Sequence, residues 1–316
     1  MGSSWSSMWP PSPKLTEENL PNQTGKVFII TGASGGVGKE LVSILYKHNA
    51  KIYVAARSKG KAIAAITDIE QQHPSSGGRL IFLPLDLGDL TTIRQSAEEF
   101  LRKESRLDVL WLNAGVMAPP QGSKSAQGYE LQLGTNNIGH FLFTKLLHPA
   151  LRNTAGLAPA YSVRVVWVSS NAIDIAPWPP IDFTNMDYSR EESPWTKYGR
   201  SKAGNVLHAS EFAKKTKEDG IVSVSAHPGM LTTDLQRHLP GWQRFLVQTF
   251  LTYPAKYGAY TELFAGLSDE VTVDHGDRLI APWGRFIEVR KDLFDPALGR
   301  RYWDWTEEQI RPYFAK

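Results

Sequence analysis

Short apolar runs alternate with longer amphipathic stretches along almost the whole chain, and this alternation restricts the fold more than any other feature. The runs are apolar at nearly every position, as expected when helices cover both faces of a parallel sheet. We predict strands at 26–31, 51–56, 79–85, 107–113, 162–169, 221–226 and 278–281. Predicted helices lie between them, at 36–48, 59–72, 90–103, 129–151 and 195–217. The chain is therefore predicted to form a doubly wound α/β fold, with about seven parallel strands and helices on both faces.

The length and composition are sufficient for one large domain. A chain of 316 residues with 41% hydrophobic side chains can bury a substantial core. We predict a single domain at 25–290, an N-terminal extension at 1–24 and a C-terminal helical tail at 291–316. Beyond Pro228 the pattern is broken by prolines and glycines, at Pro240, Gly241, Pro254 and Gly258. This interruption predicts a C-terminal lid at about 229–258 within the domain, and not a second domain.

Several classes of partner and cofactor are disfavoured. The net charge of +3 is spread along the chain without a basic block, so no nucleic-acid partner is expected. The chain has no cysteine and no H-E-x-x-H motif, so neither thiolate chemistry nor a metal is expected. No run approaches the ~18 apolar residues of a membrane-spanning helix. The segment 245–253 could make weak peripheral contact with a membrane, or form a helix over an apolar pocket.

The N-terminus gives two further expectations. It lacks the basic start and the apolar core of a secretory signal, so we predict a cytoplasmic location. The pattern M-G-x-x-x-S permits myristoylation at Gly2, although such short patterns are frequent and Trp5 is a bulky residue within it. The alternative is a flexible extension anchored by Trp5 and Trp9.

A glycine-rich turn, T-G-A-S-G-G-V-G, directly follows the first predicted strand and leads into a helix. Unpaired N–H groups at such a helix N-terminus, together with the helix dipole, form a cradle for phosphate. The strand–turn–helix context makes this pattern more specific than isolated glycines would be. We therefore predict a dinucleotide site that includes Gly32, Ser34, Gly36, Val37 and Gly38.

The end of the second strand indicates which dinucleotide is preferred. NAD-binding folds usually carry an acidic residue ~20 positions after the glycines, where it binds the ribose 2′-hydroxyl. Here the strand ends A-A-R-S, which places Arg57 and Ser58 at that position. Because guanidinium binds phosphate through charge-assisted hydrogen bonds, NADP(H) is the predicted cofactor. The alternative is that Arg57 caps a surface turn.

Two further strand ends carry polar residues toward the same edge of the sheet. Asp86 follows the third strand and could accept a hydrogen bond from the adenine amine or cap the next helix. Asn113 ends the fourth strand, where open α/β sheets bind their ligands. We expect Asn113 to support the cofactor and the strand ends together.

The stretch W-T-K-Y-G-R-S-K places Tyr198 and Lys202 four residues apart in a predicted helix. Residues at this spacing share one helix face, so the phenol and the ammonium group should be neighbours. The pair is either surface decoration or catalytic machinery. A neighbouring ammonium group stabilises phenolate, and we therefore predict that Lys202 lowers the pKa of Tyr198 toward neutral pH.

Seven motifs stand in an order that is far more specific than any one of them. They are T-G-A-S-G-G-V-G, D-L at 86–87, N-A-G at 113–115, N-N-I-G-H-F at 136–141, V-S-S at 168–170, Y-G-R-S-K at 198–202 and H-P-G at 227–229. Over about residues 25–290 the chain resembles the short-chain dehydrogenase/reductase family and its Rossmann fold. Within that family it is similar to the retinol-dehydrogenase-like branch, particularly to filamentous-fungal members, whose later segments read similarly to residues 251–268.

The resemblance implies a role for each motif. Tyr198 corresponds to the catalytic acid or base, Lys202 to its partner, and Ser170 to the residue that binds the substrate oxygen, with Ser169 as a structural neighbour. Asn136 corresponds to the holder of a relay water, and Thr233 to the contact for the nicotinamide amide. Besides the glycine turn, Tyr198 and Lys202, the implied cofactor contacts are Arg57, Ser58, Asp86, Leu87, Asn113, Ala114, Gly115, Pro228, Gly229, Leu231 and Thr233.

The predicted activity is hydride transfer between NADP(H) and a carbonyl or alcohol group of a bulky lipophilic molecule, as in a ketoreductase of specialised metabolism. The pocket is expected to lie between the 171–195 loop and an apolar set after Pro228: Met230, Leu231, Leu235, Trp242, Phe245, Leu246, Phe250 and Tyr253. His140 and His227 are expected to be structural. The alternatives are a non-catalytic NADP(H) sensor, or a lyase or isomerase on the same scaffold.

Two departures from the family pattern weaken any transfer of substrate identity. Trp167 stands where relatives often carry a smaller polar residue, and Tyr198 follows Ser170 by 28 positions, more than in the shortest members. The additional loop, with P-W-P-P at 177–180, is expected to form a wall of the substrate pocket. The family often pairs through the helix that carries the tyrosine, so a homodimer is possible.

Overall fold

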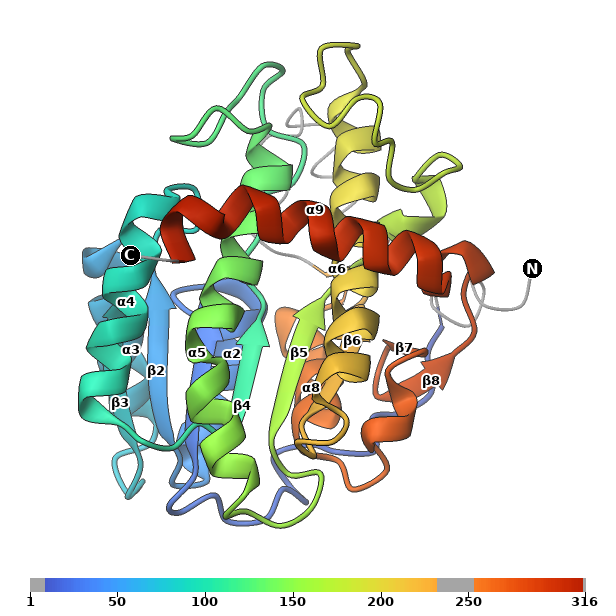
Figure 1. The fold of residues 1–316 in the computed structure, drawn as a ribbon. Coiled ribbons are helices and arrows are strands. Elements are labelled where there is room, and N and C mark those ends of the chain that lie inside the picture. Colours follow the sequence, from blue (N-terminus) through green and yellow to red (C-terminus); the bar gives the residue numbers. More distant parts are fainter. Residues whose placement is uncertain (1–8, 232–252, 315–316) are drawn as a thin grey trace.

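The computed structural model describes residues 9–231 and 253–314. Within these ranges the strands form one sheet in the order β3-β2-β1-β4-β5-β6-β7-β8 (Figure 1). Their bounds are β1 Val27–Thr31, β2 Lys51–Ala56, β3 Arg79–Pro84, β4 Val109–Leu112, β5 Arg164–Val168, β6 Val222–Ala226, β7 Leu279–Ala281 and β8 Arg285–Ile287. The strand order reverses between β1 and β4, which is where doubly wound sheets bind their ligands. The predicted fold class is confirmed.

All seven predicted strands are present and pair in parallel. The eighth strand, β8, was not predicted, and it pairs with β7 in the antiparallel direction. It has only three residues, R-F-I, and all are half-buried. Such a segment has neither the apolar run nor the alternation on which strand prediction depends.

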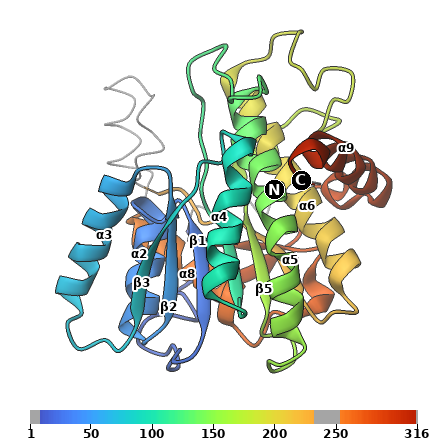
Figure 2. The same ribbon diagram turned by 60° about the vertical axis from the view of Figure 1, so that its left-hand side comes forward.

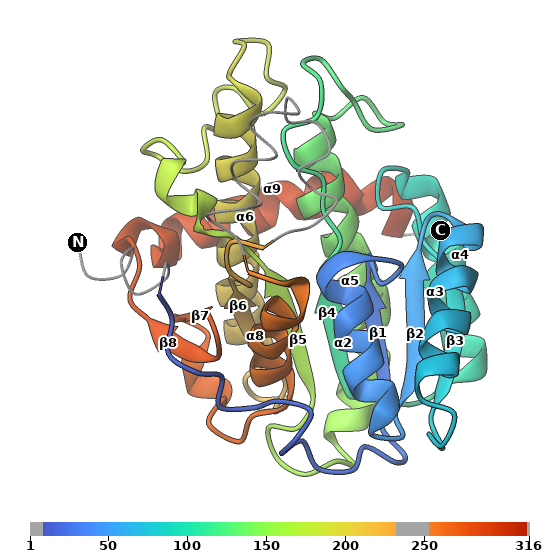
Figure 3. The same cartoon turned by 180° about the vertical axis from the view of Figure 1, so that it is seen from behind.

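Helices cover both faces of the sheet (Figures 2 and 3). On one face lie α2 (Gly36–Lys47), α3 (Lys59–Gln72) and α8 (Ala255–Leu267), which share one apolar core with the strands. On the other face lie α4 (Leu90–Lys103), α5 (His140–Ala155) and α6 (Pro194–Thr216), which surround a second core. The strands therefore have both faces buried, as their continuous apolar runs indicated.

The predicted helix at 129–151 differs in its first turns. Residues Leu133–Gly139 form a π-helical segment that continues into α5. The Glu130 carboxylate accepts hydrogen bonds from the N–H groups of Gln132 and Leu133, at 2.9 and 2.8 Å, which fixes the start of the segment. Wider π turns in helices occur often at functional sites, and this one carries Asn136.

The N-terminal extension, where described, lies against α8. Leu20 is buried in the core that α8 shares with the sheet. Tyr260 on α8 donates a hydrogen bond to the Glu17 carboxylate at 2.7 Å, and Lys256 pairs with the same carboxylate. The proposed end of the lid, residue 258, falls inside α8. Gly2 and Trp5 lie outside the described residues, as does most of the lid.

A C-terminal helix, α9 (Pro296–Phe314), crosses the outer side of α4, α5 and α6 (Figure 1). Trp303 is buried against Phe141 and Phe212, and the Tyr302 ring stacks on His208 at a centroid distance of 4.6 Å. A homodimer formed through the outer face of α6 would therefore have to form around or displace α9. In the described parts of the chain, no helix combines the length and the apolar character needed to cross a bilayer.

Candidate active site

The glycine turn after β1 is shaped by close packing against the end of β4. Gly32 has a φ of +69°, and a Cβ atom on it would lie 2.8 Å from Ala114 Cα. A Cβ atom on Gly38 would lie 2.6 Å from Asn113 Nδ2. Only glycine fits both positions without displacement. Helix α2 begins at Gly36, and no side chain caps its first N–H groups, so these donors can meet an anion.

Hydrogen bonds join the ends of β1 and β4 beneath this turn. Asn113 Nδ2 donates to the Thr31 carbonyl at 2.8 Å, and the Ala114 N–H donates to Thr31 Oγ1 at 2.9 Å. The predicted role of Asn113 in holding strand ends together therefore has a geometric basis. Its amide also fixes the position of the glycine turn.

Arg57 directly follows β2 and is exposed. It makes no hydrogen bond or ion pair with any described residue. The N-cap of the following helix, α3, is Ser58, whose hydroxyl accepts a hydrogen bond from the Lys61 N–H at 3.4 Å. The guanidinium group is therefore available to a ligand at this edge of the sheet.

For Asp86, the structure separates the two roles considered. The N-cap of α4 is Asp89, which accepts a hydrogen bond from the Thr91 N–H at 3.0 Å. Asp86 accepts through Oδ1 from the Gly88 N–H at 2.9 Å, which orients the carboxylate. Leu87, next in the chain, is buried and contacts the π-helical segment through Gly139. A helix-capping role for Asp86 is therefore wrong.

Helix α6 begins where its sequence requires, which places Tyr198 in its second turn. The Ser193 hydroxyl accepts a hydrogen bond from the Thr196 N–H at 3.0 Å, and Pro194 occupies the first helical position. Lys202 lies on the same face as Tyr198, with its Nζ 5.7 Å from the centre of the phenol ring. Both side chains are almost fully buried, so the pair is not surface decoration.

Lys202 and Asn136 meet at the N-A-G loop. Lys202 Nζ donates to the Val168 carbonyl at the end of β5, at 2.9 Å. A Cβ atom on Gly115 would lie 3.3 Å from Asn136 Oδ1 and 3.6 Å from Lys202 Nζ. Asn136 in turn binds the main chain of Val116 through both side-chain atoms, at 2.9 and 3.0 Å. Three separate segments thus converge on one point at the carboxyl edge of the sheet.

The two serines of the V-S-S motif have different surroundings. Ser169 is buried and donates a hydrogen bond to the Lys202 carbonyl at 2.9 Å. Ser170 lies half-buried; its hydroxyl donates to Asn171 Oδ1 at 3.1 Å and interacts with the phenol of Tyr198. Ser170 is therefore the serine next to the phenol, while Ser169 holds the backbone of α6.

The predicted lowering of the Tyr198 pKa is wrong for the protein without a ligand. Burial raises the pKa of Tyr198 to about 12, and the interaction with Ser170 opposes this rise only in part. Burial also lowers the pKa of Lys202 to about 8, against a smaller opposing effect of the Glu262 charge. Removal from water disfavours both charged forms, and it is the largest cause of both pKa shifts.

Both histidines near the site are neutral. Burial lowers the pKa of His140 to about 3 and that of His227 to about 4. His140 hydrogen-bonds Thr31 Oγ1 and the Asn136 carbonyl, at 3.0 and 3.2 Å. His227 Nδ1 accepts the Gly229 N–H at 3.1 Å. These contacts explain both residues as structural supports.

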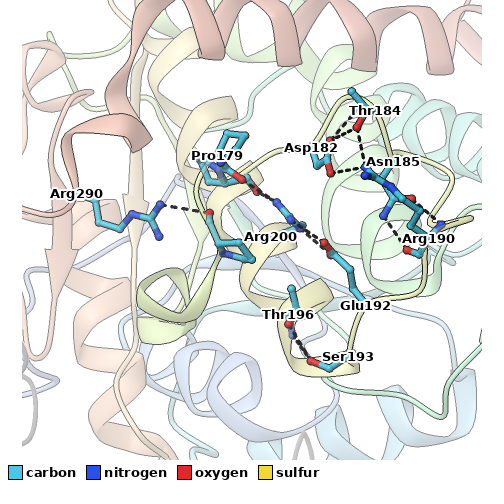
Figure 4. Close-up of polar contacts among 12 residues, drawn as sticks. Pro179, Asp182, Thr184, Asn185, Arg190, Glu192, Ser193, Thr196, Arg200 and Arg290 are labelled. Carbon is cyan, nitrogen blue, oxygen red and sulfur yellow. Dashed lines mark hydrogen bonds and ion pairs between the residues drawn. The ribbon is translucent and has the colours of Figure 1, made fainter.

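Two arginines hold the loop between Ser170 and Tyr198 (Figure 4). Arg200 on α6 pairs with Glu192 through two hydrogen bonds of 2.7 Å and donates to the Pro179 carbonyl at 2.8 Å. Arg290, which follows β8, donates to the Ile173 and Ala176 carbonyls at 3.2 and 2.5 Å. Sequence reasoning assigned no role to either arginine. Arg200 stands inside the Y-G-R-S-K motif, but nothing in its spacing indicates what it binds.

Three large apolar side chains of this region are exposed. Ile175 is 54%, Trp178 81% and Trp195 41% exposed. Trp195 lies one helical turn before Tyr198, and the two rings meet edge to face with their centres 6.3 Å apart. Trp195, the last residue of the 171–195 stretch that was predicted to line the substrate pocket, stands beside the phenol. Behind the strand, Trp167 fills the space against His208 and Phe212 of α6.

The segment after β6 is described as far as Leu231. A Cβ atom on Gly258 of α8 would lie 3.0 Å from Val37 of the glycine turn and 3.3 Å from Pro228, so these segments pack together. Gly229 has a φ of +102°. Of the predicted apolar lining, Met230, Leu231 and Tyr253 are described. Thr233 and the remaining predicted lining residues, Leu235, Trp242, Phe245, Leu246 and Phe250, lie outside the described residues.

The comparisons with known proteins agree with this geometry. Residues 26–177 match the model of the short-chain dehydrogenase family. A short-chain dehydrogenase/reductase of Phomopsis amygdali is 49% identical over 98% of this chain and 96% of its own. The chain belongs to the short-chain dehydrogenase/reductase family. A second fungal member, pkfC of Emericella nidulans, is 52% identical over 95% of this chain and 97% of its own.

Two solved structures support the fold. An uncharacterized protein from Mycobacterium paratuberculosis is 28% identical, with a TM-score of 0.71 over 95% of this chain and 98% of its own. An NADPH-bound carbonyl reductase from chicken liver is 20% identical, with a TM-score of 0.64 over 85% of this chain and 100% of its own. The predicted resemblance to the family and its fungal members is thus confirmed. Family membership makes this chain an oxidoreductase that uses a nicotinamide cofactor.

Proposed function

We propose that this protein is an NADP(H)-dependent oxidoreductase that interconverts a carbonyl and an alcohol group on a bulky lipophilic molecule, in the manner of a ketoreductase of specialised metabolism. The observation that carries the proposal is the convergence of Tyr198, Lys202 and Ser170 at the carboxyl edge of the sheet, beside an uncapped glycine turn. Membership of the retinol-dehydrogenase-like branch and a cytoplasmic location remain predictions.

The bound nicotinamide would supply or accept the hydride, and the chain would handle the proton. With its pKa raised by burial, Tyr198 is a protonated phenol at neutral pH, which is the form needed to donate a proton to a carbonyl oxygen. Ser170 is placed to hydrogen-bond the same oxygen as negative charge develops on it. Lys202, anchored to the Val168 carbonyl, then supplies the positive charge that stabilises the phenolate left behind.

Arg57 supports NADP(H) over NAD(H). It stands at the end of β2, exposed and without a partner among the described residues, where the dinucleotide fold places the adenine ribose. A guanidinium group there favours a 2′-phosphate and offers no acceptor for the two ribose hydroxyls. One structural relative is described as binding NADPH, although at its level of identity only the fold is shared.

The proposed substrate class rests on the loop that follows Ser170. Exposed Ile175 and Trp178 offer apolar surface on a loop that the two arginines hold in place, and exposed Trp195 stands at the start of α6. Trp195, edge-on to Tyr198, is placed to form an apolar wall beside the reacting group. Such a wall suits a large lipophilic substrate better than a small polar one.

The experiment follows the absorbance of reduced nicotinamide while the protein acts on a panel of lipophilic ketones and alcohols. Arg57→Ala should raise the KM for NADPH far more than the KM for NADH. Arg79→Ala, which removes an exposed cation at the start of β3 on the opposite edge of the sheet, is the matched control and should change neither. Equal effects of Arg57→Ala on both cofactors would refute the NADP(H) preference.

Tyr198→Phe tests the chemistry. The phenyl ring keeps the packing, so folding and NADPH binding should persist, while turnover should fall by several orders of magnitude because the proton donor is lost. Substantial remaining turnover would overturn the assignment of Tyr198. NADPH binding without turnover of any panel member by the unmodified protein would favour a cofactor sensor instead.

A further inference from the structure

Glu262 is a buried acid that the proposed chemistry leaves without a role. It lies in the middle of α8 and has an exposed fraction of 0%. Neither carboxylate oxygen has a hydrogen-bond partner among the described residues. An acidic side chain in such a position is rarely retained without a charged partner or a function, because removal of its charge from water is costly.

The packing of α8 shows which way Glu262 faces. Gly258 and Gly266 stand one turn before it and one turn after it, on the same face of the helix. The first packs against Val37 and Pro228, and the second against the indole of Trp111 on β4. The Trp111 Nε1–H also donates to the Glu262 carbonyl at 2.8 Å. Glu262 therefore belongs to the face of α8 that packs against the sheet.

Few charged groups can act on this carboxyl group. The strands β4, β6 and β7 beneath α8 carry no titratable side chain. Other titratable groups packed on α8 come from three parts of the chain. They are Arg164 on β5, which binds the Ala265 carbonyl; Lys39, Glu40, Tyr46 and Lys47 on α2; and, in the N-terminal segment, Lys14, which pairs with Glu270, and Glu17, which binds Tyr260 and Lys256. Lys202 is the group whose charge acts on Glu262, and the effect is mutual.

Strand β5 lies between the helices that carry Glu262 and Lys202. Lys202 Nζ is bound to the Val168 carbonyl on one side of the sheet. Val168 belongs to the same apolar core as Trp111 and Leu263, the neighbour of Glu262 on α8. Helices α8 and α6, which carry the carboxyl group and the ammonium group, pack against β5 from opposite faces of the sheet. The charge of Lys202 also acts on His140, but the His140 ring is neutral and so does not compete with Glu262 for an interaction with the ammonium group.

We propose that Glu262 is a positioning residue for Lys202: as pH rises it releases its own proton, and the buried negative charge then keeps Lys202 in the ammonium form. The proposal rests on the proposed function only because that function assigns Lys202 its catalytic role. Burial raises the pKa of Glu262 to about 8 and lowers that of Lys202 to about the same value. The attraction between the two charged forms opposes both shifts, so an ionised Glu262 raises the pKa of Lys202.

The first test needs no cofactor or substrate. Glu262→Gln removes the ionisable group and keeps the shape, so its thermal stability should match that of the unmodified protein near about pH 4.5 and exceed it increasingly up to about pH 8. Thr261→Val, at a buried and unpartnered neighbour on α8, is the matched control and should give a difference that does not vary with pH. If Glu262→Gln unfolds the protein, Glu262→Met serves instead.

The coupling itself is measured by repeating Glu262→Gln in a Lys202→Met background. Without the ammonium group, the buried carboxylate loses its compensation, so the stabilisation by Glu262→Gln at alkaline pH should be larger there than in the unmodified background. The same stabilisation in both backgrounds would overturn the proposal. This result does not depend on catalysis, so it stands even if the oxidoreductase function proposed above fails.

The second test is the pH profile of carbonyl reduction. In Glu262→Gln the alkaline limit of kcat should move to lower pH by about one unit, which means about a tenfold loss near pH 9 with less than about a twofold change near pH 6.5. The KM for NADPH should not change, and Thr261→Val should keep the original profile. An equal proportional loss of kcat at every pH would mean a packing defect, and would overturn the proposed action on Lys202.

Discussion

Arg200→Met should weaken the wall of the proposed substrate site and destabilise the protein. The guanidinium side chain is 8% exposed and its partner Glu192 is 19% exposed, so solvent screens this pair little. Methionine keeps the volume of the side chain but removes two hydrogen bonds to Glu192 and one to Pro179. Breaking a buried ion pair from one side costs about 3–5 kcal/mol, because the remaining charge stays desolvated. We expect the free energy of unfolding to fall by about 3 kcal/mol, at the lower end of this range, since Glu192 retains some access to water.

The neighbouring pair Arg190–Asp182 provides an internal control (Figure 4). It has a single contact of 2.9 Å, and the Arg190 side chain is 66% exposed. Exposed pairs contribute about 0–1 kcal/mol, so Arg190→Met should cost less than about 1 kcal/mol. Denaturant unfolding of both variants, with the slope of the transition checked for two-state behaviour, gives the comparison directly.

Kinetic measurements distinguish an effect on the loop that walls the proposed substrate site from an effect on the catalytic groups. Arg200 stands between Tyr198 and Lys202 in sequence, but its contacts are to the loop and not to either catalytic group. A loosened loop should raise KM for a large ketone more than for a small one, while the alkaline limit of kcat keeps its position. Equal stability losses in the Arg200→Met and Arg190→Met proteins, or a kcat loss independent of substrate size, would refute this reasoning.

Three further predictions follow from packing and charge. Trp303→Ala should cost about 3–5 kcal/mol in unfolding free energy, because it removes the ring that seats α9 on Phe141 and Phe212; denaturant unfolding checks this. Gly38→Ala should raise the dissociation constant for NADPH in a fluorescence titration, since its methyl group would displace Asn113. Burial lowers the pKa of His140 from 6.5 to about 3, so between these two pH values only the unfolded chain takes up a proton at this residue. The free energy of unfolding should therefore fall as pH drops below about 6.5, by up to about 5 kcal/mol. This part of the loss should be absent in His140→Asn.

The sequence predicted those features that depend on local pattern. The strand runs, the glycine turn, and the helix start at Ser193–Pro194 are all fixed by short-range rules, and their positions agree with the structure to within a few residues. The placement of Arg57 and Asn113 also follows from such rules, because parallel strands bring their carboxyl ends to one edge. The missed features are non-local: β8 pairs only because β7 lies beside it, and the position of α9, although not its helical character, depends on the faces of three other helices.

The electrostatics of the site could not be derived from spacing at all. The four-residue interval between Tyr198 and Lys202 predicted their proximity correctly, but the sign of the pKa shift depends on how much water surrounds them. Burial acts on both groups, and it comes from segments distant in sequence, such as α8, the N-A-G loop and the end of β5. Glu262 was overlooked for the same reason, since 60 residues separate it from Lys202 along the chain. Burial keeps the phenol of Tyr198 protonated, and Lys202 supplies the positive charge that stabilises its phenolate. The helices that carry Lys202 and Glu262 lie on opposite sides of β5, so this arrangement exists only in the assembled sheet.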